Sequence, residues 1–272
     1  MRTPKKKSAK KTAKKTAKKS TKRPAGASKL SRLVKRVKTV KKILRRPQKA
    51  KDAKPAAEEK HVVVLHGLIV NKYFMAGISS HLEKQGYTVH SMSYPTRGKS
   101  FDKLLDEHIV PVIDKIPAKK VDFVVHSMGG LMVRMYALKY GVEKIGRVVM
   151  IGTPNHGSPV ADFVSRWPAF RWYLGEASKS LRADRDGIHA QLPPVNFECG
   201  VIAGDNHWFR AASSAIVPDL SQLNDGVVSI ESTKVEGMKE HTVVSGDHSQ
   251  MVWMPRVWKL ASAFLKTGSF TT

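Results

Sequence analysis

From residue 61 onward, short runs of apolar and mostly β-branched residues alternate with segments of helical periodicity. Buried parallel strands form continuous hydrophobic runs, whereas apolar residues spaced three and four apart indicate a helix. The expected strands cover residues 61–66, 87–92, 121–125, 147–151, 197–203, 227–230 and 242–244. The expected helices cover residues 74–85, 101–116 and 131–140. This alternation predicts the α/β fold class, with a mostly parallel sheet and helices on both of its faces.

The positive charge of the chain is concentrated at its N-terminus. Of the 48 lysine and arginine residues, 23 lie in residues 1–51, which contain no aspartate or glutamate. The rest of the chain holds 25 basic and 22 acidic residues and is therefore nearly neutral. Its length suits a single α/β domain. The sequence predicts a basic tail over residues 1–60, ending in a linker rich in Pro, Ala and charge over 47–60, and one folded domain over 61–272.

The basic tail has two parts of different character. Residues 5–19 (KKKSAKKTAKKTAKK) have almost no apolar surface, which predicts disorder, and their composition is similar to that of the lysine-rich tails of linker histones. Residues 29–46 place apolar residues at helical spacing among basic ones, which predicts a basic amphipathic helix stopped by Pro47. Three partners stay open for this helix: an anionic membrane surface, nucleic-acid phosphates, or the body of the protein itself.

Cysteine content and hydropathy bear on the cellular compartment. Cys199 is the only cysteine, so no internal disulfide can form, and its apolar neighbours indicate a buried strand thiol. The chain has no apolar run of the roughly 18 residues that a membrane span needs, and its start lacks the apolar segment of a secretory signal. The expected location is cytoplasmic, with the tail attaching the protein peripherally to a membrane or to nucleic acid.

The segment VHSMGG (125–130) stands between the expected strand 121–125 and the helix that follows it. A sharp strand-to-helix turn with small flanking residues lifts a serine Oγ clear of a sheet, which is the arrangement called a nucleophile elbow. Ser127 occupies that turn, and two glycines follow it closely. Val125 stands where a small residue is usual, so its β-branched side chain is expected to crowd the turn. Ser127 is the candidate nucleophile.

Five segments in this order resemble the α/β-hydrolase superfamily, and within it bacterial lipases and esterases of the triacylglycerol-lipase type, over residues 61 to about 265. They are VVVLHGL, VVHSMGGL, VMIGTPNHGSP, LNDGVVSIES and VVSGDHSQM. The resemblance implies an α/β-hydrolase fold and a serine hydrolase that cleaves carboxylic esters through an acyl-enzyme intermediate. The alternatives are a thioesterase or acyltransferase with the same triad, and a nucleic-acid-associated binding protein that keeps the fold as a scaffold.

A serine hydroxyl becomes a good nucleophile only when a neighbouring base accepts its proton. Among the eleven histidines, His248 is the candidate base, because it follows the expected strand 242–244 in the loop SGDHSQM, where the hydrolase family has its histidine. His126 adjoins the nucleophile in sequence, but its side chain is expected to point away from the serine oxygen. His66 and His156 are expected to form hydrogen bonds within loops.

The third member of the triad is a carboxylate, which the hydrolase order of serine, acid and histidine requires between the nucleophile and His248. Asp225 is the candidate, because it lies in the turn Asn-Asp-Gly before the expected strand 227–230. Asp205 is the alternative, and Asp247 is too near the histidine in sequence to orient it easily.

The resemblance also implies an oxyanion hole formed by the backbone N–H groups of Leu68 and Met128. The sequence has no histidine or cysteine cluster with metal-ligand spacing, no P-loop and no GxGxxG segment. Neither a metal nor a cofactor is therefore expected.

Residues 158–194 carry aromatic residues without strand periodicity, and the resemblance implies that this insertion forms a cap over the active site. The aromatic residues are Phe163, Trp167, Phe170, Trp172 and Tyr173. They either line a pocket or lid for an acyl chain or pack against one another in a hydrophobic core that belongs to the cap alone. The expected substrate is an ester or lipid whose acyl chain lies against this insertion.

Overall fold

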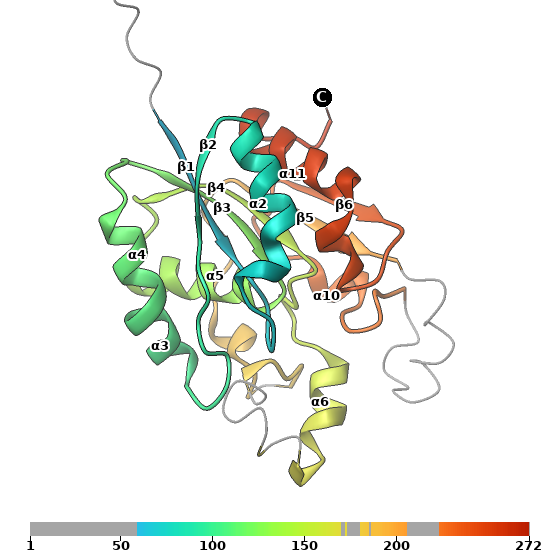
Figure 1. The fold of residues 1–272 in the computed structure, drawn as a ribbon. Helices are drawn as coiled ribbons and strands as arrows, with labels where there is room; N and C mark the ends of the chain where they lie inside the picture. The colour runs from blue at the N-terminus through green and yellow to red at the C-terminus, as the bar shows by residue number, and fades with distance from the viewer. Residues whose placement is uncertain (1–58, 170–171, 173–179, 185, 206–222, 272) are drawn as a thin grey trace, which may run out of the picture. The chain divides into compact units, whose positions relative to one another are not determined.

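A computed structural model describes residues 59–169, 172, 180–184, 186–205 and 223–271 (Figure 1). The basic tail, its expected helix over 29–46 and nearly all of the linker lie outside the described residues. Within the part that is described, no helix is both long enough and apolar enough to cross a bilayer.

Within the described residues, six parallel strands form one sheet in the order β2-β1-β3-β4-β5-β6 (Figure 1). They are β1 (Lys60–Leu65), β2 (Tyr87–Ser91), β3 (Val121–His126), β4 (Ile145–Ile151), β5 (Cys199–Gly204) and β6 (Glu240–Val244). Each confirms an expected strand. Because all six run in the same direction, their carboxyl ends meet at one edge of the sheet, and ligand sites of parallel sheets form outside that edge.

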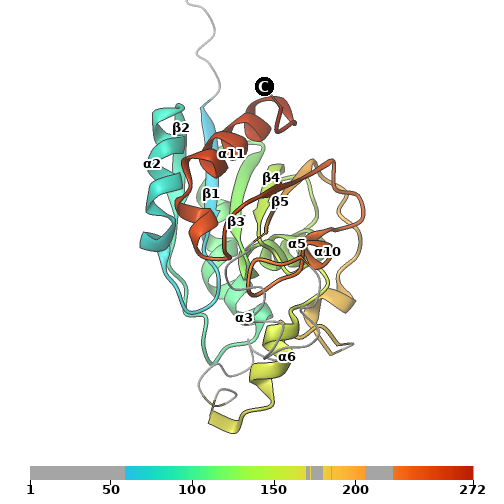
Figure 2. The same ribbon diagram turned by 90° about the vertical axis from the view of Figure 1, so that its right-hand side faces the viewer.

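Helices cover both faces of the sheet, as the sequence predicts (Figure 2). On one face α2 and α11 pack over Val62 and Val64 of β1, and on the other α3, α4 and α5 pack over Val63 and Leu65. The helical elements are η1 (Lys72–Met75), α2 (Ala76–Lys84), α3 (Phe101–Leu104), η2 (Leu105–Ile109), α4 (Val110–Lys115), α5 (Met128–Tyr140), α6 (Pro159–Ser165), η3 (Ile188–Gln191), α10 (Ile230–Thr233), η5 (Gln250–Trp253) and α11 (Pro255–Thr267).

The expected helix over 101–116 is one helical segment that contains a wide turn. α3, η2 and α4 follow each other without a break, and η2 has π-helical geometry, with the N–H of Val110 bonded to the carbonyl of Leu105. Pro111 lies in the next turn. Proline has no N–H to donate and its ring clashes with the carbonyl four residues earlier, so a wider turn relieves that contact.

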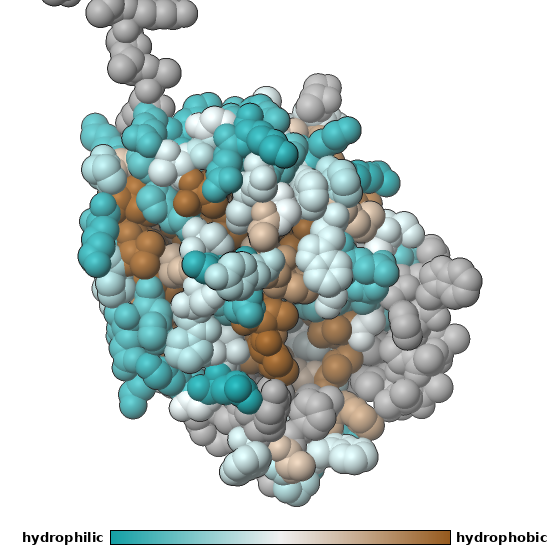
Figure 3. All heavy atoms as spheres, viewed as in Figure 1, coloured by the Kyte–Doolittle hydropathy of each residue, from teal (hydrophilic) through white to brown (hydrophobic). Residues whose placement is uncertain are grey.

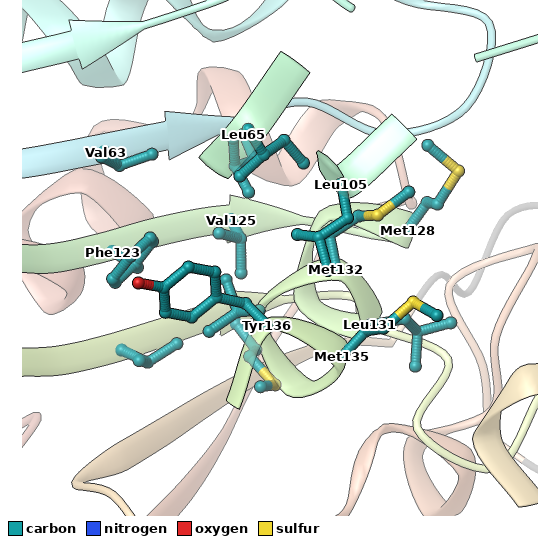
Figure 4. Close-up of a cluster of buried hydrophobic side chains, with 14 of the residues drawn as sticks. Val63, Leu65, Leu105, Phe123, Val125, Met128, Leu131, Met132, Met135 and Tyr136 are labelled. Atoms are coloured by element: carbon teal, nitrogen blue, oxygen red, sulfur yellow. The ribbon is translucent and has the colours of Figure 1, made fainter. Parts of the chain in front are cut away.

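Val125 does not disturb the turn that it was expected to crowd. Its side chain is fully buried in the hydrophobic cluster between the sheet and α5, near Leu65, Phe123 and Met132 (Figure 4). A valine at the end of a buried strand thus adds apolar contacts to the core. The following turn keeps the backbone geometry described below.

The expected strand over 227–230 is wrong. Asp225 Oδ1 accepts hydrogen bonds from the N–H groups of Val227 and Val228 at 3.0 and 2.7 Å, so these amides are not available for a sheet. A Ser229 side chain then caps α10 by accepting from the Ser232 N–H at 3.1 Å. Local side-chain bonds of this kind compete with strand pairing, and here they produce a turn followed by a short helix.

Candidate active site

Ser127 lies alone between the last residue of β3 and the first residue of α5. Its backbone has φ 53° and ψ −121°, in a region that L-residues other than glycine rarely adopt. The Ser127 N–H donates to the carbonyl of Ile151 at 2.9 Å, and its own carbonyl accepts from the Gly130 N–H at 3.0 Å. The strained turn is therefore held by neighbours on both sides, as a nucleophile elbow requires.

Glycines make room for this turn. A Cβ on Gly129 would lie 3.0 Å from the carbonyl oxygen of Leu65, and a Cβ on Gly130 would overlap the side chain of Thr153. The first turn of α5 thus fits against the ends of β1 and β4 only because these two residues lack side chains. This contact explains the two glycines after the expected nucleophile.

The structure brings His248 and Asp225 together. His248 Nδ1 lies 2.7 Å from Asp225 Oδ2, and the His248 N–H donates to the Asp225 carbonyl at 2.9 Å. The side chain of Asp225 is completely buried, and its other oxygen, Oδ1, accepts the two backbone N–H groups already described. An ionised carboxylate accepts all of these bonds, which assigns a hydrogen to Nδ1 of the imidazole, and in the neutral ring Nε2 is then an acceptor.

The two other acids that the sequence offered have different surroundings. Asp247 Oδ1 accepts from the N–H groups of Ser249 and Gln250 at 2.9 and 2.8 Å, so its side chain closes a local turn. Asp205 follows β5, and its N–H donates to the carbonyl of Val244 at 2.9 Å. The imidazole of His248 is paired with Asp225.

His126 connects the loop of His248 to the elbow, a contact that sequence analysis did not predict. His126 Nε2 donates to the His248 carbonyl at 2.9 Å, and the two ring centroids are 4.8 Å apart. His126 is the last residue of β3 and directly precedes Ser127. The candidate nucleophile, base and acid therefore lie at the same edge of the sheet.

The two residues expected to form an oxyanion hole, Leu68 and Met128, belong to segments that adjoin Ser127. Met128 is the first residue of α5, and the first N–H groups of a helix have no acceptor within it. Leu68 follows Gly67, and a Cβ on Gly67 would lie only 3.0 Å from the Cβ of Ser127. The loop after β1 thus passes directly beside the serine.

His66 fixes the peptide that carries the Leu68 N–H. Its Nδ1 donates to the carbonyl of Gly67 at 2.8 Å, while its Nε2 accepts from the N–H of Tyr94 at 3.3 Å. The ring stacks on that of Tyr94 with centroids 4.1 Å apart, and burial lowers the pKa of His66. Because the Gly67 carbonyl and the Leu68 N–H belong to one planar peptide, the neutral His66 ring orients both. His66 forms the loop hydrogen bonds expected of it.

Gly152, at the end of β4, lies against the His248–Asp225 pair. A Cβ at this position would lie 3.1 Å from His248 Nδ1 and 3.2 Å from Asp225 Oδ2, and the residue has φ 59°. Both the space and the backbone conformation therefore favour glycine here. Gly152 is not among the residues predicted for the site, although a glycine directly after a central strand indicates that another part of the chain approaches the backbone closely.

We expect Gly152→Ala to lower at least about tenfold the kcat of any reaction that depends on the His248–Asp225 pair, because the new methyl group displaces the imidazole and small displacements of reacting groups have large effects. Gly86→Ala is the matched control, since Gly86 has φ 87° and open space around it, so it adds a similar backbone strain without the collision. Steady-state kinetics and melting temperatures of both variants test this. Equal kcat values for the two variants would contradict the expectation.

The expected cap is described in part. It contains α6 and η3, whereas Phe170 and Tyr173 lie outside the described residues. The side chains of Trp167 and Trp172 are 59% and 87% exposed, so these two residues are too exposed to belong to a hydrophobic core of the cap. In the view of Figure 3, hydrophobic surface gathers along the loop after β1 and near α6. The described part of the cap therefore leaves apolar side chains exposed on the surface.

Cys199 is a structural residue, as expected. It lies in β5, is fully buried, and burial raises the pKa of its thiol to about 12. A thiol in this environment is a poor nucleophile because it stays protonated. Among the described residues, no three histidine, cysteine, aspartate or glutamate side chains are grouped so that they could hold a metal ion.

Comparisons with known proteins agree with this architecture. Residues 60–196 match the model of a family described as alpha/beta hydrolase fold. The mature lipase BlEst2 of Bacillus licheniformis is similar in structure with a TM-score of 0.60 and 18% identity, covering 79% of this chain and 94% of the lipase. The esterase EaEST of Exiguobacterium antarcticum has a TM-score of 0.54 and 15% identity, covering 76% and 92%. The metagenomic carboxyl esterase MGS0156 has a TM-score of 0.53 and 18% identity, covering 71% and 65%.

Proposed function

Because this chain belongs to the α/β-hydrolase fold family, we propose that it hydrolyses carboxylic esters through an acyl-enzyme intermediate on Ser127. The observation that carries the proposal is the constellation at the carboxyl edge of the sheet. There the strained turn at Ser127 adjoins the loop of His248, whose Nδ1 lies 2.7 Å from the buried carboxylate of Asp225. The esterases and the lipase of similar fold agree with this reaction class.

The first half of the reaction forms the acyl-enzyme. Ser127 Oγ attacks the ester carbonyl carbon while His248 Nε2 accepts the hydroxyl proton. The tetrahedral intermediate then breaks its bond to the alcohol oxygen, which leaves with the proton held by the imidazole. Asp225 accepts a hydrogen bond from the Nδ1–H group throughout and stabilises the imidazolium that forms between the two steps.

The second half hydrolyses the acyl-enzyme. A water molecule gives a proton to His248 and attacks the acyl carbon, and the returning proton goes to Ser127 as the acid departs. The N–H groups of Leu68 and Met128 are the proposed donors to the oxyanion in both halves. Loss of one such donor typically raises the barrier by about 3 kcal/mol.

The substrate class is inferred from exposed apolar side chains of the cap and of the loop after β1, which passes beside Ser127. Exposed Trp167 and Trp172, together with the apolar loop after β1, favour an ester with a hydrophobic acyl chain. Each methylene buried from water contributes about 0.8 kcal/mol. A medium-length chain is therefore expected to give a higher kcat/KM than a short one.

Hydrolysis of p-nitrophenyl butyrate and p-nitrophenyl octanoate by the full chain tests this proposal. We expect release of p-nitrophenol from both esters well above the rate in buffer, with a higher kcat/KM for the octanoate. A folded protein, verified by circular dichroism, that hydrolyses neither ester would refute the proposed function. Activity with a higher kcat/KM for butyrate would refute only the assignment of the acyl site.

A further inference from the structure

The loop that carries His248 is anchored to the rest of the molecule through the backbone of that residue. Its N–H donates to the carbonyl of Asp225, and its carbonyl accepts from His126 Nε2, both at 2.9 Å. The first bond connects the loop to the acid. The second connects it to the residue before Ser127, so that one side chain joins the loop of the base to the nucleophile's turn.

The surroundings of His126 leave this bond as the one polar interaction of its ring among the described residues. The side chain is 97% buried, since its exposed fraction is 3%, and Nδ1 has no hydrogen-bond partner in the described part of the chain. The ring of Phe74 lies 5.4 Å away, measured between centroids, and shields it from solvent. Buried polar rings normally satisfy both nitrogens, so the residue is not explained as ordinary core filling.

The protonation state of His126 follows from the same contacts. Burial, reinforced by the nearby His248, lowers its pKa to about 3. The ring is therefore neutral around pH 7, and because a carbonyl only accepts, its single hydrogen must be on Nε2. A neutral donor can hold the His248 carbonyl without adding a positive charge beside the imidazolium that forms during the reaction.

We propose that His126 is a positioning residue for the ester hydrolysis proposed above: through its Nε2–H bond to the His248 carbonyl it holds the base in register with the elbow that carries Ser127. The inference rests on the proposed function and adds a residue outside the triad. It also gives a reason for histidine at 126, where an apolar side chain would fill the buried space without this bond.

Two substitutions separate the hydrogen bond from the volume of the ring. His126→Phe keeps a buried planar ring without a donor, and His126→Gln can present an amide N–H near the position of Nε2. We expect His126→Phe to lower kcat about 10- to 100-fold with little change in KM, since displacement of a catalytic group by about 1 Å can have effects of this size. His126→Gln is expected to restore kcat to within about threefold of the wild type.

A control combines His126→Phe with His248→Ala, a variant in which no base remains to be positioned. There we expect His126→Phe to leave the residual activity unchanged, because coupled residues lose their separate effects when one is removed. Amide hydrogen exchange provides a readout besides activity: exchange at residues 246–250 is expected to be faster in His126→Phe than in the wild type or His126→Gln. His126→Leu, without donor or ring, replaces His126→Phe if the latter does not fold.

The outcomes distinguish this inference from the proposed function. A wild type that is active, together with a folded His126→Phe of equal kcat, would overturn the positioning role and leave the hydrolase intact. Equal losses in His126→Phe and His126→Gln would also overturn it, because the donor would then be irrelevant. An inactive wild type would instead refute the proposed function, and the exchange data would still report whether His126 holds the loop.

Discussion

Ser127→Ala is expected to lower kcat for p-nitrophenyl butyrate by about 10⁴- to 10⁶-fold, the range found when one member of a catalytic triad is removed. Without the hydroxyl no acyl-enzyme can form, and the remaining groups can only stabilise direct attack by water. The melting temperature is expected to stay near that of the wild type, because Ser127 Oγ makes no capping hydrogen bond to α5. Kinetics and calorimetry on the same preparations measure both quantities.

The combination of lost activity and retained stability is the informative result. Loss of activity together with a large fall in melting temperature would indicate unfolding and would call for a repeat with Ser127→Gly, since glycine adopts φ 53° without strain. A folded Ser127→Ala with more than a tenth of the wild-type kcat would contradict the assignment of the nucleophile.

Asp225→Asn is expected to lower kcat by about 10⁴-fold with little change in fold, as isosteric replacement of a triad acid does. The two backbone N–H groups that point at Oδ1 require an acceptor there, so the amide must present its oxygen to them and its NH₂ to His248. An NH₂ group cannot accept from Nδ1. The imidazole then carries its hydrogen on Nε2 and cannot take the proton of Ser127.

Asp205→Asn is the matched control for the acid. It makes the same chemical change in the acid that the sequence offered as the alternative, and its activity is expected to stay close to that of the wild type. The pair of variants is compared by kcat at the pH optimum of the wild type. An inactive Asp205→Asn beside a fully active Asp225→Asn would show that the acid has been assigned to the wrong residue.

The sheet could be predicted from the sequence because its strands are buried on both faces. Strands such as β1 and β3 form continuous β-branched runs, which neither a surface helix nor a loop produces. The strand over 227–230 was predicted from the same signal and is wrong. The apolar run correctly indicated burial, since Val228 is buried. The side chain of Asp225, however, accepts hydrogen bonds from the backbone N–H groups that a strand would need for pairing.

The site was partly predictable for a similar reason. Ser127 and His248 follow strands whose carboxyl ends share one edge, so their places along the chain indicate proximity. The role of His126 was not predictable, because it depends on a contact with the His248 loop, 122 residues away along the chain. Gly152 could be recognised from the sequence only as a place where another group comes close, and the sequence does not indicate which group. The charge pattern of the tail predicts a polyanionic partner, and this stays a prediction because the tail lies outside the described residues.

The most direct test of the central claim is to label the wild type with a fluorophosphonate and to locate the adduct by tandem mass spectrometry. We predict one adduct per chain, on Ser127, with ester hydrolysis lost in proportion to labelling and no adduct on Ser127→Ala. An active protein that labels at another residue, or that stays unlabelled while it hydrolyses esters, would contradict an acyl-enzyme on Ser127.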